Sequence, residues 1–177
     1  MKKSILLLAM TCLFGGTIFT SCNDDDNDNT PIIDPVVYTA NFTGITETTL
    51  NSGHAPMTFP GTPRQKVIIT RDTLDRTVLI YKDWTGMGTN YGDFSIPVSI
   101  TSTDNGQIGI SGDCIQTLYK DSKGYEATLG VTGKIFSQAI IDGEGRKDSC
   151  SLLITVNMPV SPTKTLDFLL DYKGITE

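Results

Sequence analysis

The sequence has very little of what catalysis and metal binding need. Among its 177 residues there is one histidine, His54, and there is no G-x-S-x-G segment. A Ser-His-Asp triad would have to form around that single imidazole, and a histidine in a loop is usually a solvated bystander. Zinc sites use clustered His and Cys ligands, which His54 lacks. We therefore predict no enzymatic activity, no metal site and no cofactor.

An acidic segment, "DGEGRKD" at Asp142–Asp148, is the nearest approach to a calcium loop. Calcium loops alternate acidic ligands around a glycine turn. Here Arg146 and Lys147 interrupt the acids, and the segment is shorter than an EF-hand loop. We interpret it as the charged tip of a hairpin.

Positive charge is also scarce. The chain has 14 Lys and Arg against 20 Asp and Glu, a formal net charge of −6, and no basic stripe. Proteins that bind nucleic acid usually carry such a stripe or patch. Nucleic acid is therefore not an expected partner.

No apolar run is long enough to span a bilayer, which takes roughly 20 residues. The segment Ile5–Ile18 is shorter and follows Lys2 and Lys3, as in a secretory signal peptide. Thr20 and Ser21 then precede Cys22, an arrangement that resembles the lipobox of bacterial lipoproteins. We expect residues 1–21 to be removed and Cys22 to carry acyl chains such as palmitate. The alternative is an ordinary signal peptide with an incidental cysteine.

Residues 22–35 are expected to form an acidic flexible spacer. Positions 23–29 are all Asn or Asp, so this stretch cannot bury apolar surface. Acids just after a lipidated cysteine resemble the export signal of surface lipoproteins in Gram-negative gut bacteria. We expect a stable lipid anchor in the outer membrane, with the protein facing outside. A plain spacer and periplasmic retention is the alternative.

Helical periodicity is nearly absent from the remaining domain, residues 36–177. Apolar and polar residues instead alternate with period two, which is typical of half-buried strands. The alternation predicts eight strands: Val37–Leu50, Gln65–Asp72, Thr77–Trp84, Gly92–Thr103, Gln107–Leu118, Tyr125–Ser137, Ser149–Met158 and Thr165–Gly174.

Short links separate most of these strands, and they include the Asn-Gly pair at Asn105–Gly106, a strong hairpin signal. Successive strands should therefore pair as a meander. A meander has two bare edges, and pairing the first strand with the last removes both. We predict an all-β, eight-stranded antiparallel up-and-down barrel, whose interior is either filled or holds one small ligand.

Several strand segments are similar to the calycin-like β-barrel lipoproteins of Gram-negative gut bacteria. The resemblance covers nearly the whole domain, in the segments "YTANFTG", "GDFSIPVSI", "YEATLGVTGKI", "SLLITVNMPV" and "LDFLLDYKG". It implies a lipocalin-related barrel. It transfers no catalytic residues, because the family has no agreed activity.

Aromatic residues gather in the Gly-rich segment Tyr81–Phe94, which reads as a connection between two strands. Alternating strand direction places this connection at the same end of the barrel as the long loop that carries Met57 and Phe59. The predicted ligand-binding rim therefore comprises Met57, Phe59, Tyr81, Trp84 and Tyr91. Aromatics at a barrel mouth can grip an apolar ligand or stack on sugar rings. The alternative is that Trp84 merely plugs this end.

Two functions remain open on this basis. The first is a non-catalytic, surface-exposed module that binds a small apolar or glycan ligand. The second is a structural or protein-interaction component of an outer-membrane assembly. A barrel packed solid with no cleft at its rim would count against the first.

The tripeptide "DTL" at Asp72–Leu74 resembles the O-glycosylation acceptor of the same bacterial group, with Thr73 as the acceptor. The segment lies in the link between the second and third predicted strands. We therefore expect Thr73 to be exposed at a hairpin tip.

Two cysteines remain in the exported domain, Cys114 and Cys150. Alternation turns both inward, but one predicted strand lies between them. Two strand spacings are about 9.5 Å, whereas disulfides need Cα atoms about 4.4–6.8 Å apart. We expect two buried, reduced thiols, and a disulfide only if the fifth strand bends near Cys114.

Overall fold

Nine antiparallel strands form one sheet in the computed structural model, which describes residues 38–103, 107–120, 122–137 and 147–177. The strands are β1 (Ala40–Asn51), β2 (Met57–Arg71), β3 (Thr77–Gly86), β4 (Thr89–Pro97), β5 (Ser99–Ser102), β6 (Gln107–Lys120), β7 (Lys123–Ser137), β8 (Asp148–Ser161) and β9 (Lys164–Thr176). Over these residues, no helix is long and apolar enough to cross a membrane.

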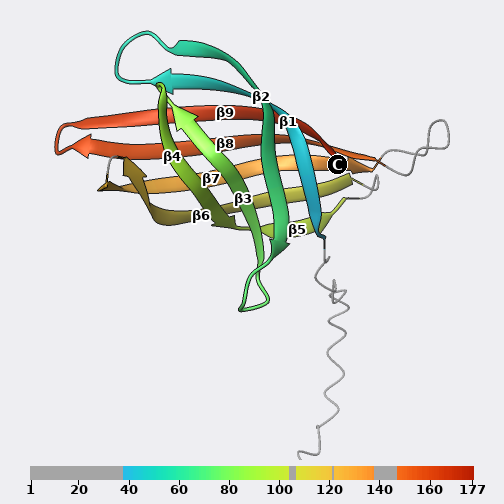
Figure 1. Cartoon of the computed structure of the whole chain (residues 1–177). Helices are drawn as coiled ribbons and strands as arrows, with labels where there is room; N and C mark the ends of the chain where they lie inside the picture. The colour runs from blue at the N-terminus through green and yellow to red at the C-terminus, as the bar shows by residue number, and fades with distance from the viewer. Residues whose placement is uncertain (1–37, 104–106, 121, 138–146) are drawn as a thin grey trace, which may run out of the picture. The chain divides into compact units, whose positions relative to one another are not determined.

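The sheet follows the predicted meander, in the order β4-β3-β2-β1-β9-β8-β7-β6-β5. The first and last strands pair along their length, from Phe42↔Thr176 to Asn51↔Asp167. This pairing confirms the prediction that the two terminal strands meet. In Figure 1 the sheet curls so that β2, β3 and β4 cross in front of β6 to β9.

The predicted fourth strand is divided, which gives nine strands instead of eight. Residues up to Pro97 pair with β3, and residues from Ser99 pair with β6. Pro97 has no N–H and cannot donate to a ladder. Val98, which donates to Thr77 O at 2.9 Å, is the point where the strand exchanges one partner for the other. The prediction of a single strand over 92–103 was therefore wrong.

The barrel is open, which corrects the prediction of a closed one. No backbone ladder joins β4 to β6; these two facing edges are called the seam below. Side chains of β6 bridge the seam: Ser95 N donates to Gln116 Oε1 at 3.0 Å, and the Cys114 thiol donates to Ser95 O at 3.4 Å. At its narrow end, a Cβ on Gly112 would lie 2.1 Å from Pro97 O, so only glycine fits there. The result is a half-barrel.

Two segments that read as long loops are mostly strand. β2 begins at Met57, and β3 and β4 are joined by only Met87 and Gly88, whose φ values are 52° and 74°. Two residues with positive φ are the requirement of the tight hairpin turn that matches strand twist. Residues 57–64 of β2 pair only with β1, so Pro60 and Pro63 remove no hydrogen bond from a second ladder.

The core lies between the two crossing layers of the curled sheet and follows the predicted alternation. Inward residues of most long strands are buried, for example Val67 and Ile69 on β2 and Leu152, Ile154 and Val156 on β8, whereas several on β6 are only partly buried. The largest fully buried side chains are aromatic: Trp84, Tyr81, Tyr172, Phe42, Phe94 and Phe168. The interior is therefore filled by side chains at its centre.

Candidate functional site

The predicted rim is a packed aromatic cluster. The Trp84 side chain is 1% exposed, and its ring stacks on Tyr91 with centroids 4.7 Å apart. Phe94 and Phe168 meet the indole edge-on, at 6.0 Å and 5.1 Å. This arrangement matches the plug interpretation, because Trp84 is enclosed by rings instead of facing solvent.

Met57 and Phe59 reach the same end, as the alternation of strand direction predicts. Met57 pairs with Leu50, Leu50 pairs with Phe168, and Phe168 contacts Trp84. Phe59 is partly buried against the core, whereas Met57 is half exposed. The structure thus brings the predicted rim residues together but leaves only Met57 substantially open to solvent.

The backbone beside Trp84 is irregular and is held by Asp93. The β3–β4 register shifts on both sides of Trp84, and Asp83 adopts φ 48°, a costly value for a residue other than glycine. Asp83 N donates to Asp93 Oδ1 at 2.9 Å, and Lys82 forms an ion pair with the same carboxylate. The Lys82 ammonium and the Asp83 N–H lower the pKa of Asp93. This clamp fixes the bulge that turns Trp84 inward.

Deeper in the barrel, Tyr81 belongs to a small polar cluster. Its hydroxyl lies 2.7 Å from Thr46 Oγ1, and Tyr172 OH donates to Gln65 O at 3.3 Å. Burial raises the pKa of Tyr81 to about 12, so the phenol stays protonated. These contacts satisfy buried hydroxyls, and they leave Tyr81 no surface for a ligand.

The opposite end of the half-barrel keeps an open groove of about 540 Å³. It is called the arginine groove below, and its lining comes from the base of the β2–β3 hairpin and the β4–β5 bend: Arg71, Asp75, Arg76, Thr77, Pro97, Val98, Ser99 and Ile100. Arg71 continues the inward register of Val67 and Ile69. Val98 and Ile100 pack partly buried against the core. A cationic group therefore lies beside apolar wall at the end of the barrel interior.

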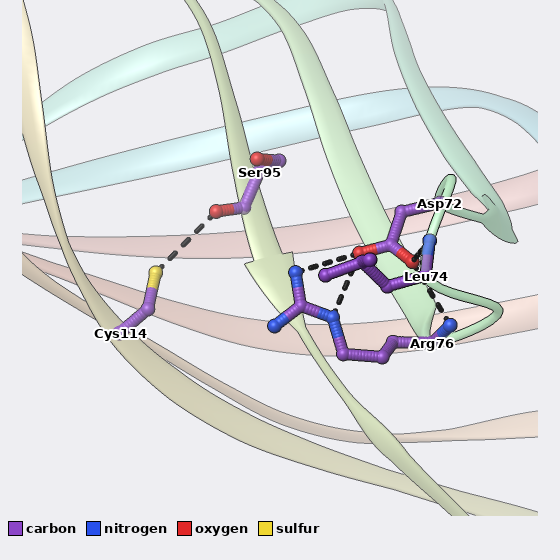
Figure 2. Close-up of polar contacts among 5 residues, drawn as sticks. All are labelled: Asp72, Leu74, Arg76, Ser95 and Cys114. Carbon is purple, nitrogen blue, oxygen red and sulfur yellow. Dashed lines mark hydrogen bonds and ion pairs between the residues drawn. The ribbon is translucent and has the colours of Figure 1, made fainter.

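The β2–β3 hairpin that forms one side of this groove is organised by Asp72 (Figure 2). Asp72 Oδ1 accepts hydrogen bonds from the backbone N–H groups of Leu74 and Arg76, both at 2.9 Å, while Oδ2 accepts from Arg76 Nε at 2.8 Å. The Arg76 backbone and guanidinium lower the pKa of Asp72. Thr73, the predicted glycosylation acceptor, is exposed at the tip, as its position in the sequence suggested.

The two domain cysteines are free, and Cys150 is buried as expected, whereas Cys114 is only partly buried, which corrects the prediction for that residue. Cys150 pairs in register with Ile135, and Ile135 pairs with Ile108, six residues before Cys114 on β6. The thiols are therefore offset by about 20 Å along the strand direction, in addition to the intervening strand. Cys150 is buried, and burial raises its pKa to about 12.

Other predicted features lie outside the described residues. They include the signal peptide, Cys22 with its lipid, the acidic spacer, and the Asn-Gly turn. Most of the acidic segment Asp142–Asp148 is also outside. Within the described ranges, no three His, Cys, Asp or Glu side chains gather as a metal site.

The arginine groove was missed by the sequence interpretation. One signal was present, because Arg71 stands at an inward position at the end of a strand, directly after the apolar inward residues Val67 and Ile69. Ile100, which lines the same groove, lies far away in the sheet order.

Comparisons with known proteins give a fold likeness only. No protein-family model matches the chain, and neither does any curated protein. The structure of a putative outer membrane protein from Bacteroides fragilis has a TM-score of 0.52 at 22% identity, over 78% of this chain and 50% of that one. A Bacteroides ovatus protein of unknown function has a TM-score of 0.45 at 11% identity, over 79% and 42% of the two chains. The chain thus spans about half the length of these structures or less, and it shares the curled all-β fold of the first.

Proposed function

We propose that this chain is a non-catalytic binding module of the bacterial outer membrane, which takes a small apolar or glycan ligand at the arginine groove. One observation carries the proposal: the Trp84 end of the interior is filled, whereas the opposite end keeps a groove lined by both apolar and polar side chains. Ligand sites in proteins combine these features, a concave apolar wall with a few polar groups that fix orientation.

The location is part of the same proposal. The lipobox-like segment before Cys22 supports a lipid anchor, and the acidic run after it supports display on the outer face. The fold likeness to a protein named for the outer membrane, and the resemblance to calycin-like lipoproteins, agree with this location. Replacing Cys22 by Ser should move the chain out of the membrane fraction, and protease treatment of intact cells should degrade the anchored form.

Native mass spectrometry tests ligand binding directly. The chain should be purified from the membranes of its own bacterium in a mild non-ionic detergent. We expect a retained mass in addition to the lipoprotein, and this mass should be released when the groove residue Ile100 is replaced by Asn. A bare lipoprotein, together with no change in melting temperature across a panel of small apolar and glycan compounds, would contradict the proposal.

A second function, contact with a protein partner, is favoured by the outer part of the β1–β2 hairpin. Residues 57–64 of β2 pair with β1 and not with β3. Met57, the first of them, is half exposed. Because Pro60 and Pro63 lack N–H donors, a partner would contact side chains here instead of extending the sheet. A photo-crosslinker at position 57 should then capture one defined membrane protein in cells, whereas a crosslinker at position 173 should not.

Modification of Thr73 remains a separate proposal. The residue is exposed at the tip of the β2–β3 hairpin, where an enzyme can reach it. Peptide mass spectra of native protein should show added hexose or related sugar mass on Thr73, which the Thr73→Ala variant loses. Unmodified Thr73 in native protein would overturn this proposal.

A further inference from the structure

The arginine groove has a charge pattern that selects among ligands. Its lining contains Arg71, Arg76 and Asp75, and each arginine has one carboxylate partner, Asp75 for Arg71 and Asp72 for Arg76. The same lining includes the apolar residues Pro97, Val98 and Ile100. The groove therefore combines charged and apolar side chains.

The two arginines are held differently. Arg76 is fixed by Asp72, which receives both its Nε and its Nη2 groups, at 2.8 Å and 2.7 Å. Among the described residues Arg71 forms an ion pair with Asp75 alone, whose side chain is 76% exposed. Exposed ion pairs are weak and exchange readily with other anions. Arg71 is therefore the arginine whose ion-pair partner a ligand can displace.

Arg71 also has unused hydrogen-bonding capacity. Among the described residues its Nε is buried and has no hydrogen-bond partner. A buried donor without a partner is costly and calls for an explanation. Guanidinium groups match carboxylate and phosphate oxygens because they present several N–H donors in one plane.

We propose that the groove binds an anionic amphiphile, with a carboxylate or phosphate on Arg71 and an aliphatic chain along Val98 and Ile100. The inference rests on the proposed function and names the class of ligand for its groove. On binding, the anion replaces the Asp75 carboxylate at Arg71, and the aliphatic chain covers the exposed end of the barrel core.

Isothermal titration calorimetry with defined probes tests this inference. The chain lacking residues 1–21 is suitable, because residues 34–177 form one compact unit that contains every described strand. The probes are dodecanoate and dodecyl phosphate, both below their micelle concentrations, with 1-dodecanol as the neutral control and acetate as the control without a chain. We expect one site for each anionic amphiphile, at least ten-fold weaker binding of dodecanol, and no binding of acetate.

Three variants locate the site. Arg71→Met keeps the aliphatic stem and should weaken dodecanoate binding about ten-fold or more, because it removes a charge-assisted contact. Asp75→Asn should strengthen binding several-fold, because it frees Arg71; Asn also tolerates the positive φ of 60° at this position. Arg64→Met, on the same strand but outside the groove, should change nothing.

Two results would overturn the inference. One is dodecanol binding as tightly as dodecanoate, and the other is unchanged affinity in both Arg71→Met and Asp75→Asn. If Arg71→Met does not fold, as judged by its melting curve, Asp75→Asn alone decides the question. A neutral molecule retained in native mass spectrometry, with no dodecanoate binding, would refute the inference yet leave the proposed function standing. Absence of both would refute both.

Discussion

The two ends of the half-barrel use the same sheet in opposite ways. At one end Trp84, Tyr91, Phe94 and Phe168 pack ring against ring, and little apolar surface is left for another molecule. At the other end the last inward residue of β2 is Arg71, and it lines an open groove together with partly buried apolar residues. The first end therefore serves stability, and the second is free to serve recognition.

The sharpest test of this contrast is the loss of the Trp84 ring. Trp84→Ala should lower the free energy of unfolding by about 3–5 kcal/mol, because it leaves a cavity among three aromatic rings. Urea denaturation measures the change. Arg71→Met, at the open end, should cost no more than about 1 kcal/mol because its ion pair is partly exposed.

Trp84→Phe is the control for the ring itself. The Trp84 Nε1 atom is buried without a hydrogen-bond partner among the described residues. Phe retains much of the packing and removes this donor, so its cost should be well below that of Ala. Equal stability of Trp84→Ala and the unmodified chain would contradict the view that this end is the structural one.

A smaller effect is expected inside the filled half. Tyr81→Phe removes the hydroxyl that lies 2.7 Å from Thr46 Oγ1 while leaving the ring stacked on Phe94 at 5.0 Å. The substitution should lower the free energy of unfolding by about 1 kcal/mol, because it removes one hydrogen bond and leaves the Thr46 hydroxyl without its partner. Thr46→Val in the same background should add little, since the two groups share that bond. Full additivity of the two substitutions would show that the hydroxyls do not interact.

The sequence predicted the path of the chain better than the surface of the barrel. Alternation locates the strands, and the short links determine which strands pair, including β1 with β9. The alternation did not reveal the division at Val98, because Phe94, Ile96, Val98 and Ile100 keep one register across the change of partner. Pro97 was the signal that could have located it. The alternation of apolar and polar residues indicates which face of a strand is buried. It does not indicate which neighbouring strand forms the backbone hydrogen bonds.

Strand direction predicted which residues lie toward the Trp84 end, and it did not predict how tightly they pack. The rim residues do share one end, as strand direction requires. Their burial depends on the irregular backbone at Asp83 and on the two-residue turn at Met87 and Gly88, which lengthen β3 and β4 into a segment that reads as a loop. Glycine-rich composition suggested a loop between two strands, whereas Gly88 and Gly92 supply positive φ values within tight geometry around Trp84.

The acid limit of stability offers a test of the Asp93 clamp. Its pKa is lowered in the folded chain, so its stabilising contribution is present above the unfolded value of about 3.9 and is lost as pH falls through the lower folded value. Asp93→Asn should therefore reduce stability at pH 6 by less than about 1 kcal/mol, since the pair with Lys82 is substantially exposed. The difference between the two proteins should shrink below about pH 4. Denaturant melts at pH 3 and pH 6 measure it, and a difference that grows in acid would contradict the clamp.

The mildest probe of the two regions is thiol chemistry, which alters no side chain of the strands before measurement. Cys114 lies at the seam, where its thiol donates to Ser95 O, and it is partly exposed, whereas Cys150 is buried in the filled core. Burial raises the pKa of both thiols, that of Cys150 to about 12, so little thiolate exists at pH 8 in the folded state. In the chain lacking residues 1–21 and carrying Cys22→Ser, a maleimide should modify Cys114 first and Cys150 much later. Unfolding without reductant should expose two reactive thiols. No label after unfolding would mean a disulfide that the register forbids, and faster labelling of Cys150 would mean that the core opens before the seam does.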